Sequence, residues 1–256
     1  MIGYHLSRTG VTAHPFYISH IGIGLTSVEE LCYFICQYPA LVDETVLNQK
    51  LTRWLAEEFR LNAPALAMER GIRRSAGLED ILLPFMRDVG YLDAGEQKAF
   101  RRILEALETG GAALRLKMKG DALVRNRRFG EAAAAYTQAE NAVRQGEEKL
   151  HASILHNKGV ALMQLLSYEE AYRAFRAALA LEDTPERKRV LLIAAGIAKP
   201  RALLLPEADE IGADPDTVKL VEEMLDAAAG AEIEIPEDLP AALESIRSAY
   251  HREAGT

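Results

Sequence analysis

The chain has 256 residues, of which 49 % are hydrophobic and 27 % charged, a composition typical of a globular protein rather than a disordered or disulfide-dense one. Its 38 acidic and 30 basic residues give a net charge of −8, which disfavours nucleic acid as a partner. No segment approaches the roughly 20 uninterrupted apolar residues of a transmembrane helix, and polar residues interrupt the first 25 positions, where a signal peptide would lie. We therefore expect a cytoplasmic protein that contacts no membrane.

The N-terminal part is predicted to be helical after a short irregular or extended arm at residues 1–25. Aromatic, β-branched and glycine residues at 15–24 indicate an extended segment or short strand. Ser27 and Glu30 have the spacing of a capping box, which opens a helix. Asp43 is predicted to begin a second helix, whose apolar residues recur every three to four positions: Leu47, Leu51, Trp54, Leu55 and Phe59.

Three further helices are expected before residue 111. Pro64 fits the first turn of one helix. Residues 78–89 form the next, with Pro84 close enough to its start to be tolerated or to kink it. A second capping-box pattern at 93–96 opens the last, and the glycine pair at 110–111 ends it.

The two cysteines, Cys32 and Cys36, are four positions apart and so share one face of a helix. This spacing differs from that of a C-x-x-C pair, and no second pair completes a metal site. We interpret them as small apolar packing residues, with a redox or metal role as the alternative. Neither a metal nor a cofactor is predicted.

Proline positions divide the chain. No proline lies between Pro84 and Pro185, which favours continuous helical packing, whereas prolines are frequent after residue 199. We therefore expect an N-terminal helical region at 1–110, a repeat region at 111–199, and acidic C-terminal helices at 200–256 that cap the stack.

The repeat region contains two copies of one pattern, offset by 39 residues. Gly120 and Gly159 are each followed 12 residues later by an alanine, 16 later by an aromatic residue and 19 later by another alanine. Each copy is predicted to be two helices joined by a tight turn, with small residues where the helices approach and an aromatic ring filling the gap. The packing residues are Gly120, Ala132, Tyr136 and Ala139 in the first copy, and Gly159, Ala171, Phe175 and Ala178 in the second.

This pattern resembles the tetratricopeptide (TPR) repeat, over about residues 112–184. There are departures: leucines replace two large aromatic residues of the family in each first helix, Lys119 and Lys158 stand where an apolar residue precedes the glycine, and the period exceeds the usual 34. The resemblance implies an all-α superhelix of antiparallel helix pairs. It also implies a concave groove lined by the first helix of each pair, with these candidate residues: Lys117, Asp121, Val124, Arg125, His156, Val160, Met163 and Gln164.

Charge is unevenly distributed. Residues 111–200 carry 15 basic and 10 acidic residues, whereas residues 201–256 carry 4 and 14. One interpretation makes the basic charges a solvated helix face. The sharper hypothesis is a basic groove for an acidic or carboxylate-ended peptide, and a third is that the acidic tail at 207–253 folds back on the repeats.

No catalytic motif is found: the six histidines are scattered, and His151 and His156 are five apart, which does not fit a metal pair on one helix face. We expect a non-catalytic interaction module or adaptor that binds a peptide or helix of another protein. The alternative is a regulatory protein of the same fold that senses a peptide or ligand, and a remote alternative is an unrecognised enzyme. A further alternative makes the segment 15–25 dock on a second subunit, giving a homodimer.

Overall fold

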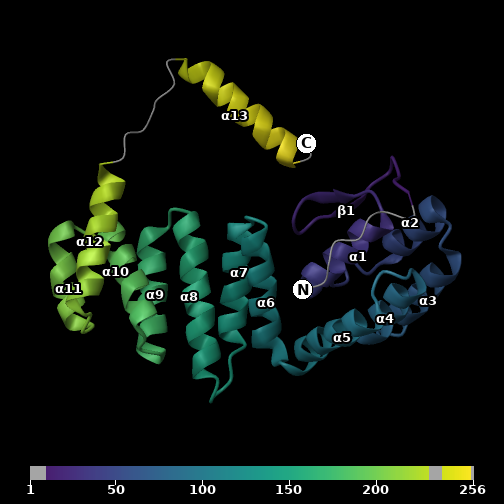
Figure 1. The fold of residues 1–256 in the computed structure, drawn as a ribbon, viewed down its shortest axis with the longest axis horizontal. Helices are drawn as coiled ribbons and strands as arrows, with labels where there is room; N and C mark the ends of the chain where they lie inside the picture. The colour runs from purple at the N-terminus through teal and green to yellow at the C-terminus, as the bar shows by residue number, and fades with distance from the viewer. Residues whose placement is uncertain (1–9, 231–237, 255–256) are drawn as a thin grey trace. The chain divides into compact units, whose positions relative to one another are not determined.

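The computed structural model describes residues 10–230 and 238–254, so the start of the predicted arm and residues 231–237 of the acidic tail lie outside it. The predicted all-α class with a short extended N-terminal segment is confirmed (Figure 1). The chain divides into two compact units, here named the N-terminal unit (residues 1–126) and the C-terminal unit (residues 127–256). The predicted boundaries at 110 and 199 stay predictions.

The N-terminal segment is a hairpin of two antiparallel strands, β1 (Phe16–Ile18) and β2 (Ile23–Leu25). Phe16 packs against Trp54, with ring centroids 5.8 Å apart, and the Trp54 indole N–H donates to the carbonyl of His14 at 2.8 Å. The hairpin therefore packs on its own unit, because its inward side chains are buried there.

The helices of the N-terminal unit pack in sequence order: α2 against α3, α3 against α4, α4 against α5, and α5 against α6. Their bounds are α1 (Val28–Gln37), the 3-10 helix η1 (Pro39–Leu41), α2 (Gln49–Phe59), α3 (Asn62–Arg73), α4 (Leu78–Asp88), α5 (Ala94–Thr109) and α6 (Gly111–Arg125). Pro84 lies inside α4, and Gly110 separates α5 from α6.

The predicted helix start at Asp43 is wrong. Asp43 lies in the connection between η1 and α2, where its carboxylate accepts from the backbone N–H of Thr45. Asn48 is the residue that caps α2, and its side chain accepts from two N–H groups of the first turn. Asp43 is therefore neither part of a helix nor the cap of α2.

The two capping boxes differ. Asp93 and Glu96 form a complete one at the start of α5. Ser27 caps α1 by accepting from the N–H of Glu30, but the Glu30 carboxylate accepts from the N–H and hydroxyl of Thr26 instead of the N–H of Ser27. Glu30 thereby holds the end of the hairpin to the first helix.

In the C-terminal unit α7 packs against α8, α8 against α9, and α9 against α10, which in turn packs against α11 and α12 (Figure 1). The bounds are α7 (Phe129–Asn141), α8 (Glu148–Gln164), α9 (Tyr168–Leu181), α10 (Pro185–Ala198), the 3-10 helix η2 (Arg201–Leu203), α11 (Leu204–Glu210), α12 (Pro215–Ala229) and α13 (Leu239–Ala254). The packing of adjacent helices is that of a helical-repeat protein.

The two sequence copies have the same backbone plan. Helices α6 and α8 end at Arg125 and Gln164, and α7 and α9 begin at Phe129 and Tyr168, each 39 residues apart. The turns match as well, because Arg127 and Leu166 both adopt the left-handed conformation, with φ of 58° and 61°. The 39-residue period of the sequence is therefore also present in the backbone dihedral angles of the two turns.

The predicted packing residues lie in the interior. Tyr136 and Phe175 are 1 % and 2 % exposed, and the four alanines are fully buried. In the C-terminal unit the reason for glycine is direct: a Cβ at Gly159 would lie 2.6 Å from a ring carbon of Phe175. Only a residue without a side chain lets α8 approach this ring so closely.

Candidate functional site

The C-terminal unit has a recess of about 560 Å³ between α7 and α9, with α8 as its floor. We name it the α7–α9 recess. The floor leucines, Leu155 and Leu162, are 6 % and 8 % exposed, so apolar surface lies at the bottom. The walls are mostly small side chains: Ala133, Ala134 and Thr137 on α7, and Ala174 and Ala177 on α9.

Four charged side chains also line the α7–α9 recess. Glu140 and Lys158 form an ion pair across α7 and α8, with 2.9 Å between carboxylate oxygen and ammonium. Glu170 and Arg173 lie on α9, and neither forms an ion pair with another described residue. The lining thus carries two positive and two negative charges on an apolar base, an arrangement that suits a peptide backbone with small apolar side chains.

The predicted groove residues of the second copy lie on another face of α8. Val160 and Met163 are partly buried against the core formed with α9 and α10. The His156 ring lies edge-on to Phe175, with 5.4 Å between the ring centroids. The pKa of His156 is lowered, mainly by burial and to a smaller extent by the positive charge of the nearby Arg187. Gln164 is exposed. These residues and the floor of the recess are therefore not one surface.

The predicted residues of the first copy lie on α6, in the N-terminal unit. Lys117 and Asp121 form an ion pair with each other at 2.8 Å, and both are largely shielded from solvent. Val124 is half-buried and Arg125 is exposed. Of the two predicted cations, Arg125 has the more accessible charge, since the ammonium of Lys117 is already engaged.

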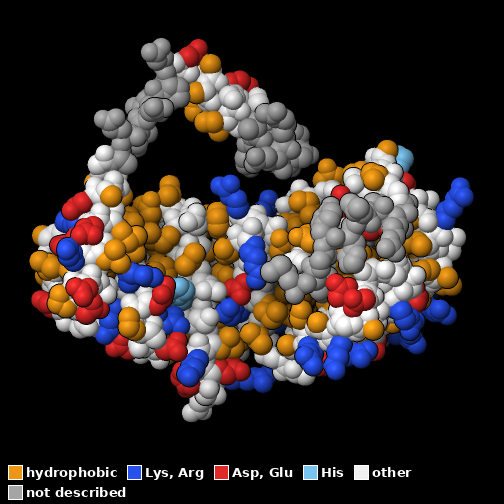
Figure 2. Space-filling model, in the orientation of Figure 1, with side chains coloured by type: hydrophobic (Ala, Val, Ile, Leu, Met, Phe, Trp, Pro, Cys, Tyr) orange, Lys and Arg blue, Asp and Glu red, His pale blue; other side chains and the backbone are white. Residues whose placement is uncertain are grey.

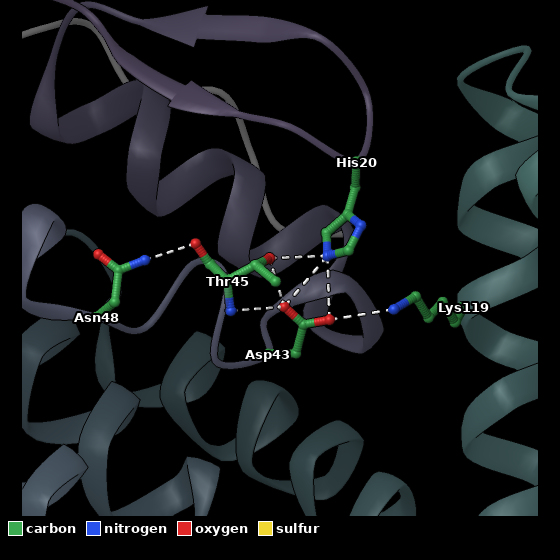
Figure 3. A network of polar contacts seen from close by, with 5 residues as sticks. All are labelled: His20, Asp43, Thr45, Asn48 and Lys119. Atoms are coloured by element: carbon green, nitrogen blue, oxygen red, sulfur yellow. Dashed lines mark hydrogen bonds and ion pairs between the residues drawn. The ribbon is translucent and has the colours of Figure 1, made fainter.

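A polar network in the N-terminal unit joins three segments far apart in the sequence (Figure 3). His20 from the loop of the hairpin, Thr45 from the segment before α2 and Lys119 from α6 all contact the Asp43 carboxylate. The Lys119 ammonium lies 3.1 Å from one carboxylate oxygen, and the His20 ring nitrogen Nε2 lies 3.0 Å from the same oxygen. We name these four residues the Asp43 network.

The Asp43 network holds the carboxylate charged. Burial alone raises the pKa of Asp43, but hydrogen bonds from Thr45, His20 and Lys119 outweigh it and lower the pKa to about 2. The arrangement differs from a nucleophile–histidine–carboxylate relay, which needs the two ring nitrogens to face different partners. Here Asp43 and the Thr45 hydroxyl both contact Nε2 of His20, so the geometry is that of an anchor between segments.

The two lysines that depart from the repeat pattern have equivalent uses. Lys119 and Lys158 are 39 residues apart, and each pairs with a carboxylate on a preceding segment: Asp43 for the first and Glu140 for the second. The preceding segment is η1 with its connection in one case, and α7 in the other. Their signal in the sequence was a lysine at a position where the TPR pattern, which the two copies resemble, has an apolar residue.

A second carboxylate held by cations lies in the C-terminal unit, and this one is buried. Glu207 of α11 is 5 % exposed, and its two oxygens accept from the Tyr172 hydroxyl at 2.8 and 2.9 Å. Lys199 and Arg176 contact it at 2.9 and 3.2 Å, and the Lys199 ammonium also lies 3.8 Å from the centre of the Tyr172 ring. Burial raises the pKa of Glu207, yet the bonds from Lys199 and Tyr172 lower it overall. This cluster fastens α11 to α9 and the end of α10.

Replacing Glu207 by glutamine is expected to destabilise the C-terminal unit by about 1–2 kcal/mol, because the amide loses the charge that faces Lys199 and Arg176. The cost stays moderate since both cations reach solvent. Urea unfolding followed by circular dichroism measures it. Glu210→Gln is the control: Glu210 also pairs with Arg176 but is 58 % exposed, and a loss as large as that of Glu207→Gln would contradict the role of burial.

Both cysteines are buried free thiols on α1. Burial raises the pKa of Cys32 well above its ordinary value, and burial with the nearby Glu96 raises the pKa of Cys36 to about 12.

Within the described ranges, no three His, Cys, Asp or Glu side chains are placed to hold a metal ion, and no helix has the length and apolar character to cross a bilayer. Comparison of the chain with known protein families, curated proteins and solved structures finds no match.

Proposed function

We propose that the chain is a non-catalytic interaction module, a TPR-like adaptor that binds a peptide or helix of another protein. The observation that carries the proposal is the α7–α9 recess, which combines an apolar floor with small walls that let a partner backbone approach closely. The two conspicuous polar clusters support it, because both connect elements of the fold and neither has the geometry of an acid–base relay.

The recess favours a partner with small apolar side chains. Its lining charges balance, so the recess itself gives no preference for an acidic partner. Such a preference would favour the groove predicted from the sequence instead, where Arg125 is exposed. The two free, buried thiols suit a reducing compartment, and we therefore propose the cytoplasm as the place of action.

The test is capture of partners from the lysate of the source organism, followed by measured affinities for the peptide segment identified. Ala177→Trp places a large ring in the recess and should weaken binding by at least about tenfold. Ala180→Trp is the matched control, because Ala180 is exposed on the same helix but does not line the recess. A third protein, Lys117→Glu with Arg125→Glu, tests the groove predicted from the sequence.

The outcomes separate the two surfaces. Loss of binding in Ala177→Trp alone supports the α7–α9 recess. Loss only in the Lys117/Arg125 variant moves the site to the predicted groove and removes the recess from the proposal. Equal binding by all the variants places the contact on neither surface, and a chain that retains no protein partner contradicts the adaptor function.

A further inference from the structure

A second cavity lies in the N-terminal unit, between α3 and α4. The two helices are in close contact where Gly71 meets Ile81, because a Cβ on Gly71 would be 2.8 Å from the Ile81 side chain. Beside this crossing is a cavity of about 230 Å³, which we name the α3–α4 cavity. It is smaller than the roughly 300–1,000 Å³ of sites for drug-sized ligands, and so it suits a ligand with one side chain.

The α3–α4 cavity has an apolar floor, and the α4 helix beside it lacks one backbone hydrogen bond. Met68, Ile81 and Phe85 are 2 %, 6 % and 2 % exposed, and all three line it. Pro84 lines it too, and proline has no N–H, so the carbonyl of Asp80 lacks the helical donor four residues later. This carbonyl can therefore accept a hydrogen bond from a donor outside the helix.

Charges of both signs line the same cavity without neutralising each other. Arg70 lies on α3 and Arg74 is its C-terminal cap residue, whereas Asp80 and Asp88 lie on α4. No ion pair between the two sets occurs among the described residues. The neighbouring Arg73 is different, because it pairs with Glu69 at 2.6 Å. Figure 2 shows Lys and Arg side chains gathered along the edge of this unit formed by α3 to α5.

We propose that the α3–α4 cavity binds an apolar α-amino acid of about the size of leucine, either free or as the C-terminal residue of a peptide. Its carboxylate meets the guanidinium groups of Arg70 and Arg74. Its amino or amide N–H donates to the carbonyl of Asp80, and its side chain lies on the apolar floor. The site is independent of the α7–α9 recess, so this inference does not rest on the proposed function.

The experiment is a titration of the full chain by calorimetry and methyl NMR. The probes are L-leucine, N-acetyl-L-leucine and L-leucinamide. The first two should bind, and leucinamide should bind at least about tenfold more weakly because it lacks the carboxylate. Tighter binding of leucine identifies a free amino acid as the ligand, whereas tighter binding of the acetylated form identifies a peptide end.

Variants locate the site. Arg70→Met and Arg74→Met keep the apolar stems and should each weaken L-leucine by about tenfold. Arg73→Met is the matched control and should leave the affinity unchanged, because Arg73 does not line the cavity. Ala67→Leu, which fills part of the cavity, should abolish binding while leaving the circular dichroism spectrum of a folded chain.

Three results would overturn the inference. The first is no binding of L-leucine or N-acetyl-L-leucine up to about 20 mM, an affinity weaker than a charge-paired small ligand should show. The second is equal binding of leucinamide. The third is an effect of Arg73→Met as large as that of Arg70→Met, which would assign the response to general surface charge. The α7–α9 recess is untouched by all four variants, so its own test gives an independent result.

Discussion

Replacing Gly159 by valine is expected to destabilise the C-terminal unit by about 3 kcal/mol. The first atom of any side chain at this position would lie 2.6 Å from the ring of Phe175, which is itself 2 % exposed and cannot move aside into solvent. Forcing atoms into a packed core typically costs ~1–3 kcal/mol, and a branched side chain takes the upper part of that range.

The cause can be isolated by a double-mutant cycle. Phe175→Ala alone should cost about 3–5 kcal/mol, because it leaves a cavity between α8 and α9. Combined with Gly159→Val it should cost at least about 1 kcal/mol less than the sum of the two single changes, since the cavity accommodates the new side chain. Additive losses would show that the ring is not what excludes a side chain at Gly159.

Thermal unfolding by circular dichroism gives the size of the effect, and hydrogen exchange resolved to α8 and α9 gives its place. Gly130→Val is the matched control: Gly130 lies in the first turn of α7, and a Cβ there meets open space. The control should change stability by less than about 1 kcal/mol.

Replacing Asp43 by asparagine is expected to destabilise the N-terminal unit by about 2 kcal/mol at pH 7. The pKa of Asp43 falls from 3.8 to about 2 in the folded chain, and each unit of pKa corresponds to about 1.4 kcal/mol of preference for the charged form. Asparagine keeps the shape and can still accept from Thr45, but it has no charge for Lys119 or His20.

The same network predicts acid sensitivity with a definite sign. The folded pKa is depressed, so the stabilisation is fully present above the unfolded value near 4 and is lost as the pH falls through about 2. The stability of the wild-type N-terminal unit should therefore decline between about pH 5 and 2 more steeply than that of Asp43→Asn.

Fluorescence of Trp54 reports on this unit, because it is the single tryptophan and its indole contacts the hairpin. Urea unfolding curves at several pH values give both the loss of stability in Asp43→Asn at pH 7 and the decline of stability with falling pH. Glu57→Gln is the control: its ion pair with Arg53 is 4.0 Å long and exposed, so its removal should cost less than about 0.5 kcal/mol. Parallel acid curves for the wild type and Asp43→Asn would contradict the assignment.

The helices and the repeat could be predicted from the sequence because their signals are local. Ser27 and Asp93 indicate the starts of α1 and α5, because each caps its helix by accepting from the backbone N–H of the residue three positions later. The 39-residue offset in glycine, alanine and aromatic positions reappears in helix ends and turn angles. The caps and turns depend on neighbouring residues, and the repeat contacts join helices that are adjacent in the chain.

The Asp43 network could not be predicted in this way. An aspartate before an apolar, periodic segment is as good a helix cap as Asn48, and nothing nearby favours one of the two. The deciding partner is Lys119, 76 residues away. The α7–α9 recess was missed for a different reason, since its walls are largely alanine, a residue that carries no chemical signal of a site.

The burial of both sulfur atoms on α1 links oxidation of this chain to its unfolding. A thiolate is the form that peroxides and disulfides attack, and the raised pKa values keep Cys32 and Cys36 protonated throughout the physiological range. Oxidants therefore reach these sulfurs only in molecules whose N-terminal unit has opened. Oxidation of the two thiols would then accumulate in proportion to the opened population, and a folded molecule would keep both thiols intact.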